Sequence, residues 1–306
     1  MTTRAGFVAI VGAPNAGKST LVNALVGSKV SIVSPKVQTT RMRVIGIAMA
    51  DLPNGDRAQV VLVDTPGIFR IAKRRLERAM VAAAWQGAED ADVVALVVDA
   101  ERGVGEETRA IVERLKESKA PRYLILNKID LVAREKLLTL TAELNALIAF
   151  ERTFMVSALK KDGIADILAT FAAALPEGPF LYPEDQAADL PLRLLAAEVT
   201  REQVFMQLHQ ELPYEAAVET DKWEERKDGG VRIEQTIHVQ REGQRAIVLG
   251  KGGARIKQIG ARARHELGQM LERPVHLFLH VKVSERWADD PAHYRAIGLD
   301  FDGKKR

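Results

Sequence analysis

The sequence predicts an α/β protein of two domains: a mostly parallel sheet with helices on both faces, followed by a smaller α+β domain. Short apolar runs alternate with helix-like stretches over the first 175 residues, a pattern typical of such a sheet. Prolines and glycines then interrupt helical periodicity between residues 176 and 191, which indicates a domain boundary there. A length of 306 residues also exceeds one typical core and fits two domains.

Apolar runs in the first domain are expected to form buried strands, because they are β-branched or apolar throughout. These runs are Phe7–Val11, Val60–Val63, Val93–Val98, Tyr123–Leu126 and Phe154–Val156, and Val44–Met49 is a weaker candidate. Helices are expected near residues 18–27, 73–86, 106–118, 134–148 and 163–175. Ligands of such sheets bind at the carboxyl ends of the strands, so motifs at those ends are the first functional candidates.

The composition excludes several classes of protein. With 47% apolar and 28% charged residues the chain is not disordered, and no apolar stretch approaches the ~20 residues that cross a bilayer. The first residues lack the pattern of a secretory signal peptide. Cysteine is absent, which excludes disulfides and thiolate metal sites and fits a cytoplasmic protein. Four histidines lack the local spacing of a metal site and are interpreted as structural or solvated: His238, His265, His276 and His280.

The net charge of +3 hides an uneven distribution. Residues 176–240 carry a net charge of −8, whereas residues 241–264 carry +6. Clustered charge of one sign indicates a polyanionic partner more strongly than the total charge does. The basic block over residues 241–264 is therefore a candidate nucleic-acid surface.

The first motif matches the phosphate-loop pattern G-x-x-x-x-G-K-[ST] in full, after a strand and before a helix. Glycines let the backbone wrap a phosphate, and amide N–H groups together with the helix dipole favour the anion. Lys18 supplies a cation and Ser19 a ligand for Mg²⁺. The expected nucleotide-binding residues here are Gly12, Ala13, Pro14, Asn15, Ala16, Gly17, Lys18, Ser19 and Thr20.

A second motif ends another predicted strand. Its carboxylate, Asp64, can hold Mg²⁺ through water, and the Gly67 N–H can reach a γ-phosphate. Taken alone, such a segment is an ordinary turn signal. The expected ligand-binding residues in it are Asp64, Thr65, Pro66, Gly67 and Ile68.

Two further motifs can read a guanine base. The Asp130 carboxylate can accept hydrogen bonds from guanine N1–H and the amino group, a donor pair that adenine lacks. Asn127 can bond the base edge and the loop itself, while the Lys128 stem can pack over the ring. The Ala158 N–H can meet the guanine O6. The expected residues are Asn127, Lys128, Ile129, Asp130, Ser157, Ala158 and Leu159.

Four motifs in this order, each at a strand's end, resemble the GTPase domain of the translation-factor-related class. The segment Gln38-Thr39-Thr40-Arg41 matches the first switch of that family. By that resemblance Thr40 closes onto Mg²⁺ and the γ-phosphate, with Thr39 as the alternative. The resemblance implies Ser19, Thr40 and Asp64 as the metal-binding residues, and catalytic roles for Lys18, Thr40, Asn15 and Gly67.

The residue after Gly67 is Ile68, where Ras-like proteins place the glutamine that orients the attacking water. An isoleucine side chain cannot polarise water, so slow intrinsic turnover is expected. In GTPases that carry an asparagine at the position of Asn15, it helps to bind a potassium ion that bridges the phosphates. Two interpretations stay open: Asn15 supports K⁺-stimulated hydrolysis, or it only shapes the loop.

The second domain is expected to run helix, two strands, two helices, strand. A helix is predicted over Pro191–Leu212, and strands over Tyr214–Arg226 and Val231–Gln240 flank the hairpin signal Asp228-Gly229-Gly230. Then follow a helix over Gly243–Leu249, the loop Gly250–Gly253, a helix to Leu271 and a strand over Val275–Val283.

The loop Gly250-Lys251-Gly252-Gly253 matches the G-x-x-G loop of a KH domain. Glycines there let phosphates of single-stranded nucleic acid approach closely, and helix N-termini face them. The loop also lies inside the basic block, which strengthens an otherwise weak motif. The element order resembles the type II KH arrangement. The expected RNA-binding residues are Arg245, Gly250, Lys251, Gly252, Gly253, Arg255, Lys257 and Arg262.

A GTPase domain over residues 1–178, a linker over 179–190 and a type II KH domain with its tail over 191–306 resemble the Era family of bacterial ribosome-assembly GTPases. The resemblance implies GTP or GDP with Mg²⁺ as ligands, binding to 16S ribosomal RNA near its 3′ end, and association with the 30S subunit during maturation. It also implies a cytoplasmic protein with weak peripheral attachment to the inner membrane. A monomer is expected, and the tail Lys304-Lys305-Arg306 is interpreted as solvated. The Arg-rich segment Ile71–Arg78 departs from the family pattern.

The sequence leaves two other classes of function open. In one, the chain is a binding module in which GTP only sets the conformation. In the other, the chain signals at a membrane or to a protein, and the KH fold is a protein contact.

Overall fold

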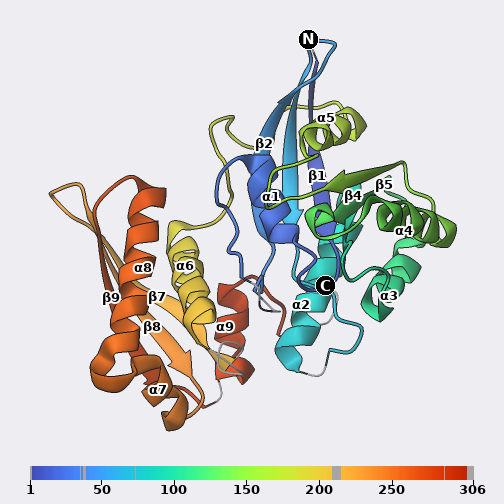
Figure 1. Ribbon diagram of the computed structural model, residues 1–306. Coiled ribbons are helices and arrows are strands. Elements are labelled where there is room, and N and C mark those ends of the chain that lie inside the picture. Colours follow the sequence, from blue (N-terminus) through green and yellow to red (C-terminus); the bar gives the residue numbers. More distant parts are fainter. Residues whose placement is uncertain are drawn as a thin grey trace. The chain divides into compact units, whose positions relative to one another are not determined.

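The structure, a computed structural model, describes residues 2–34, 36, 39–72, 74–208, 215–285 and 287–301. The chain divides into two compact units: Met1–Asp189 together with Gly298–Arg306, and Leu190–Ile297 (Figure 1). Among the described residues, no helix is long and apolar enough to cross a membrane. Several residues of the predicted segments lie outside the described ones, namely Gln38, Lys73, Tyr214 and the tail Lys304-Lys305-Arg306.

The first unit is built on a six-stranded sheet in the order β2-β3-β1-β4-β5-β6. The predicted, mostly parallel sheet is confirmed: only β2, at one edge, runs antiparallel to its neighbour β3. A short connection suffices for such an antiparallel pair, whereas parallel neighbours need crossover helices. The strands are β1 (Thr3–Val11), β2 (Val44–Asp51), β3 (Arg57–Asp64), β4 (Val93–Asp99), β5 (Arg122–Asn127) and β6 (Arg152–Val156).

Helices cover both faces of this sheet because its strands are apolar on both sides. In β1, Val8 and Ile10 belong to one core, whereas Ala9 and Val11 belong to the other. This alternation follows from the two-residue period of a strand. The helices of the unit are α1 (Lys18–Val26), α2 (Arg75–Glu89), α3 (Glu106–Leu115), α4 (Arg134–Leu147) and α5 (Ala165–Ala174), with a short 3-10 turn, η1 (Ile129–Leu131).

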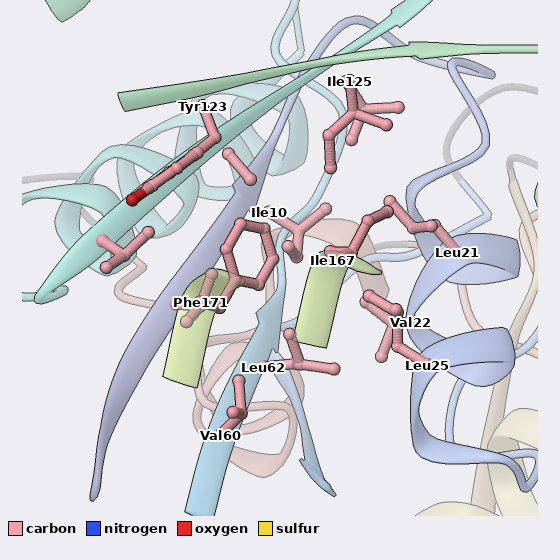
Figure 2. Packing of buried hydrophobic residues seen from close by; sticks show 14 of the residues in the cluster. Ile10, Leu21, Val22, Leu25, Val60, Leu62, Tyr123, Ile125, Ile167 and Phe171 are labelled. Carbon is pink, nitrogen blue, oxygen red and sulfur yellow. The ribbon is translucent and has the colours of Figure 1, made fainter. Parts of the chain in front are cut away.

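The core beneath α1 and α5 fixes the helix that carries the phosphate loop. Figure 2 shows Leu21 of α1 and Ile167 of α5 packed near Ile10 of β1. The Phe171 ring meets the Tyr123 ring edge-on, with centroids 5.4 Å apart. Such close packing of fully buried side chains holds the first turn of α1 in place against the sheet.

The segment expected to link the domains is bonded to the first unit. The buried side chain of Gln59 accepts hydrogen bonds from the N–H groups of Leu181 and Tyr182 at 2.8 and 2.9 Å. Its Nε2 donates to the Tyr182 carbonyl at 2.8 Å. Ala188 forms an antiparallel bridge with Gly46 at the free edge of β2. The chain up to Asp189 therefore lies within the first unit.

The second unit has a three-stranded sheet in the order β7-β8-β9. β7 and β8 form an antiparallel hairpin, and β9 joins β8 in parallel. The predicted turn between β7 and β8 contains Gly229, whose φ of 78° suits glycine. The strands are β7 (Ala217–Glu225), β8 (Val231–Val239) and β9 (Val275–Val283).

Helices cover one face of this sheet. Ile233 of β8 packs with Val199 and Leu267, and Ile237 packs in a neighbouring cluster with Ile259. One polar pair lies inside this layer, where the Thr200 hydroxyl donates to the Gln235 side-chain oxygen at 2.6 Å. The helical elements are α6 (Leu192–Gln207), α7 (Glu242–Leu249), η3 (Lys251–Gly253), α8 (Ala254–Leu271), η4 (Trp287–Asp289) and α9 (Pro291–Ala296).

The second unit differs from the sequence prediction at its ends. The first helix was expected to reach Leu212, but α6 ends at Gln207 and residues 209–214 lie outside the described ones. The short helix α9 was not predicted, because six residues are too few to show helical periodicity. The expected domain ran to residue 306, whereas the chain from Gly298 groups with the first unit.

Candidate functional site

The phosphate loop joins β1 to α1 with a backbone that needs small residues. A Cβ on Gly12 would lie 2.4 Å from the Val97 carbonyl oxygen, and one on Gly17 would lie 2.2 Å from Asn127 Nδ2. Gly17 and Asn15 also have left-handed φ angles of 94° and 63°. Because these neighbouring atoms leave no room for a Cβ, glycine is required at positions 12 and 17.

Lys18 opens α1 and buries its ammonium group inside the loop. Nζ donates to the carbonyl oxygens of Gly12 and Ala13 at 3.1 and 3.0 Å. Burial lowers the pKa of Lys18 to about 8, while the charge of Asp64 opposes the shift. A buried cation is stabilised by an anion placed beside it, and a nucleotide phosphate in the loop would be such an anion.

Hydroxyl groups gather around the Asp64 carboxylate at the end of β3. Ser19 and Ser31 each donate to Oδ2 at 2.6 Å, and Ser19 Oγ lies 2.8 Å from Thr40 Oγ1. Burial raises the pKa of Asp64, whereas the bonds from Ser19 and Ser31 and the charge of Lys18 oppose the rise. The structure thus brings together Ser19, Thr40 and Asp64, the three residues predicted to bind metal.

This cluster fits a magnesium ion. The second carboxylate oxygen of Asp64, Oδ1, is buried, and no hydrogen-bond partner for it is found among the described residues. A buried acceptor without a partner costs about 1–3 kcal/mol, a cost that a cation or its bound water would remove. Hydroxyl and carboxylate oxygens are also the donors that Mg²⁺ prefers, with water and phosphate filling its other positions.

The structure separates the two threonines of the first switch. Thr40 is buried and contacts Ser19, whereas Thr39 Oγ1 lies 2.6 Å from Ser34 Oγ and donates to the Lys36 carbonyl at 2.7 Å. Of the two threonines, Thr40 is therefore the one beside Ser19 and the Asp64 carboxylate. A cleft between this segment and the phosphate loop is lined by Asn15, Thr20, Thr40 and Gly67, among others.

The second motif, which follows β3, packs closely against the phosphate loop. A Cβ on Gly67 would lie 2.9 Å from Pro14 Cα, and the Ile68 N–H donates to the Gly12 carbonyl at 3.2 Å. The Ile68 side chain is 4% exposed and belongs to a hydrophobic core. The residue that replaces a water-orienting glutamine is thus packed inside the protein. Thr65 and Pro66 of the same motif are also buried.

Asn127 connects two loops of the site. Its Nδ2 donates to the Ala16 carbonyl at 2.9 Å, and its Oδ1 accepts from the Ala158 N–H at 3.0 Å. These bonds tie the phosphate loop to the loop that follows β6. The Ala158 N–H was expected to meet guanine O6, but the structure gives it a partner within the chain.

Lys128 and Asp130 are each held by a neighbouring side chain. Lys128 has a left-handed φ of 65°, and its Nζ donates to Asp99 Oδ2 at 2.6 Å. A hydrogen bond from the Ser157 hydroxyl lowers the pKa of Asp130, and Lys160 Nζ lies 3.4 Å from its Oδ2. Asp130 is therefore kept ionised, the form that accepts two hydrogen bonds. Ile129 is half-buried and Leu159 is exposed.

In the second unit, the glycines of the loop between α7 and α8 have two different structural roles. A Cβ on Gly250 would lie 2.8 Å from Arg255 Cβ, so this glycine permits close packing. A Cβ on Gly252 or Gly253 would have no described atom within 4 Å, so these two leave the loop surface open. All three have positive φ angles, of 68°, 59° and 76°. Helix α8 begins directly after the loop, so its first N–H groups face the same opening.

Exposed cations lie in the loop and along α8. Lys251, Lys257 and Arg262 are exposed, and for none of them is an ion-pair partner found in the part of the chain that the structure describes. The other predicted phosphate contacts have partners within the chain. Arg255 Nη1 donates to the Ile247 carbonyl at 3.1 Å, and Arg245 lies 3.4 Å from Glu242.

Both units match known protein families. Residues 7–128 match the family described as 50S ribosome-binding GTPase, and residues 211–288 match the KH domain family. GTPase Era of Afipia carboxidovorans is 60% identical over 299 residues, which cover 98% of this chain and 95% of that protein. GTPase Era of Rhizobium meliloti is 60% identical over 98% of this chain and 94% of its own length. The chain belongs to the Era family of GTPases.

Solved Era structures share the fold of this Era-family chain. A tyrosine-to-alanine variant of Aquifex aeolicus Era bound to GDP·AlF4⁻ matches with a TM-score of 0.90 and 41% identity, over 96% of this chain and 99% of that one. Era in complex with MgGDPNP and nucleotides 1506–1542 of 16S ribosomal RNA matches with a TM-score of 0.90 and 41% identity, over 97% and 99%. The predicted family and the predicted fold class are confirmed.

Sequence reasoning missed residues that support the Era nucleotide site. Ser31 bonds Asp64, and Asn23 Oδ1 positions it by accepting from the Ser31 N–H at 2.9 Å. Asp99, which holds Lys128, pairs in register with Asn127. Asp99 ends β4, so the rule that ligand sites lie at carboxyl ends could have found it. Ser31 lies in a loop without a motif, and no local signal marks it.

Proposed function

We propose that this Era-family chain is a GTP-hydrolysing switch that binds 16S ribosomal RNA near its 3′ end and acts in assembly of the 30S subunit. The observation that carries the proposal is that one chain combines two sites: a phosphate loop beside the Ser19, Thr40 and Asp64 cluster, and an open glycine loop with exposed cations. The solved Era complex with MgGDPNP and 16S ribosomal RNA nucleotides supports it.

In this proposal the phosphates lie on the N–H groups of the phosphate loop and beside Lys18. Ser19, Thr40 and Asp64 would hold Mg²⁺, which neutralises charge on the β- and γ-phosphate oxygens when bound. Closing of Thr40 onto the ion would report the presence of a γ-phosphate. Because the Ala158 N–H is engaged by Asn127, base selectivity rests chiefly on Asp130.

Hydrolysis is proposed to be slow without an activator. Ile68 is buried, so no side chain directly after Gly67 orients the attacking water. Asn15 lines the cleft and is proposed to help bind a potassium ion at the phosphates. Lys18 and the Gly67 N–H would stabilise charge that develops on the transferred phosphoryl group.

The glycine loop is proposed to clamp the backbone of single-stranded RNA. Gly252 and Gly253 let a phosphate approach, the first N–H groups of α8 face it, and Lys251, Lys257 and Arg262 supply counter-charge.

The protein is further proposed to be a monomer that attaches weakly to the surface of the inner membrane. Sedimentation with anionic lipid vesicles at physiological salt tests that attachment.

The test of the RNA assignment is the double variant Lys251→Asp with Gly252→Asp. We expect its affinity for a single-stranded RNA of the 16S 3′ end to fall by two orders of magnitude or more, because two anions enter the phosphate site. GTP affinity, measured with a fluorescent analogue, should stay at the wild-type value. The matched control Lys119→Asp changes an exposed lysine of the first unit and should leave RNA binding intact. Undiminished RNA affinity in the double variant would overturn the KH assignment.

A further inference from the structure

A cluster of metal-ligating side chains lies in the second unit, among residues that neither the nucleotide site nor the glycine loop uses. Glu219 of β7, His238 of β8 and His293 of α9 each offer one ligand atom, and these atoms all lie within 4.8 Å of one another. Glu219 Oε2 lies 3.2 Å from His238 Nε2, and Glu219 Oε1 lies 3.9 Å from His293 Nδ1. The two imidazole rings are 5.2 Å apart between centroids.

These separations are close to those of a tetrahedral zinc site. Zinc–ligand bonds of about 2.0–2.1 Å at tetrahedral angles place neighbouring ligand atoms about 3.4 Å apart. The observed separations need only small side-chain rotations to reach that value. Two imidazoles and one carboxylate form a set that zinc uses in proteins, with a fourth position left for water.

The surroundings favour ligation rather than chance proximity. Ser284 Oγ lies 3.0 Å from His238 Nδ1, so it can accept a hydrogen bond from Nδ1–H and leave Nε2 free to bind a metal. His238 is 7% exposed, whereas the Glu219 side chain is 44% exposed and leaves a path for an ion.

We infer that Glu219, His238 and His293 form a binding site for a divalent zinc-type cation in the KH unit. The ligands come from two strands and from the short helix α9, so the ion would join α9 to the sheet. Trp287, packed edge-on against His293, borders the site. Lys282 pairs in register with His238 and places an opposing positive charge near it.

Zinc titration of the full chain, free of a histidine tag and loaded with GDP and excess Mg²⁺, tests the inference. After removal of metals by a chelator, the wild type should bind one Zn²⁺ against a chromophoric competitor. Replacements His238→Ala, His293→Ala and Glu219→Gln should each weaken that affinity about tenfold or more, and Ser284→Ala should weaken it as an outer contact. Lys282→Gln should strengthen it. The matched control His280→Ala removes another histidine of the same sheet and should bind zinc as the wild type does.

Two outcomes would overturn the inference: the absence of stoichiometric zinc binding to the wild type, or equal affinities in wild type and His293→Ala. The His293→Ala variant still tests the inference if His238→Ala fails to fold. The His293 side chain is 20% exposed and therefore less buried than that of His238, so its replacement disturbs the core less. Cobalt substitution gives an independent measurement. The Co²⁺ form of the wild type should show the visible absorption of a four- or five-coordinate ion, and a purely six-coordinate aquo spectrum would equally contradict the site.

Discussion

Asn127 Nδ2 donates a hydrogen bond to the carbonyl of Ala16 at 2.9 Å, although the two residues lie 111 positions apart. The same carboxamide accepts from the Ala158 N–H, so one buried side chain joins the base end of the nucleotide site to its phosphate end. Loss of this side chain would leave two buried backbone groups without their partner.

Asn127→Ala is expected to lower the free energy of unfolding of the first unit by about 1–3 kcal/mol and to weaken GDP binding at least tenfold. Urea unfolding followed by Trp85 fluorescence, in a Trp223→Phe, Trp287→Phe background, measures the first effect. Titration with fluorescent GDP measures the second. Asn145→Ala, which removes an exposed asparagine of α4, is the control and should change neither quantity. If Asn127→Ala bound GDP with wild-type affinity, the Asn127 side chain would not be needed to join the two ends of the nucleotide site.

Asp130 gives a prediction about base selectivity. Asp130→Asn replaces one acceptor oxygen by an amino donor, which opposes the guanine amino group, so GTP affinity should fall at least about a hundredfold. Xanthosine triphosphate carries an oxygen where guanine has that amino group, so its affinity should rise relative to GTP. Competition binding with both nucleotides tests this, with Asp162→Asn as control. An unchanged preference for GTP would show that another group reads the base.

Much of this site could be predicted from the sequence, because phosphate binding demands glycines, a lysine and a hydroxyl at fixed local spacing. The positions of Gly12, Gly17 and Lys18 follow from that local rule. The supporting contacts could not be predicted in the same way. Asp99 and Lys128 meet only because β4 and β5 are neighbours, and the zinc-type cluster takes its ligands from β7, β8 and α9. Local spacing carries no information about such long-range partners.

Lys18 sets a pH dependence for the stability of the nucleotide-free protein. Burial lowers its pKa from 10.5 to about 8, so between these values the unfolded chain binds more protons than the folded one. The stability of the first unit should therefore rise with pH in this window, by at most about 1.4 kcal/mol per pH unit. Below about pH 8 the Lys18 ammonium is both charged and buried in the folded state, so its desolvation lowers the free energy of unfolding by the full amount.

The variant Lys18→Met removes this penalty. It should be more stable than the wild type at pH 7, by roughly 3 kcal/mol at most, and the advantage should shrink from about pH 8 toward 10.5. Urea unfolding at a series of pH values, followed by Trp85 as above, measures the difference. Lys119→Met, at an exposed position, serves as the control. A stability difference that stays constant over this pH range would contradict the buried, charged state of Lys18.

Asn15 leads to a prediction about monovalent cations. If its side chain helps to hold potassium at the phosphates, GTP turnover should be about tenfold or more faster in KCl than in NaCl. Asn15→Gly removes the side chain without straining the left-handed backbone and should abolish the difference. GDP affinity, measured in parallel, should be retained. Equal turnover of the wild type in the two salts would leave Asn15 with only a loop-shaping role.

Lys257 lies on α8 next to the open glycine loop, and its charge gives a prediction about the salt dependence of RNA binding. Each phosphate contact made by a cation releases counterions, so log affinity falls with log salt by about 0.7 per contact on a single strand. Lys257→Gln should therefore reduce that slope by about 0.7 and weaken binding to all RNA sequences alike. Filter binding from 50 to 300 mM KCl, on the 16S 3′-end strand and a scrambled strand, measures both effects. Lys119→Gln should keep the wild-type slope, and an unchanged slope in Lys257→Gln would place this lysine outside the RNA contact.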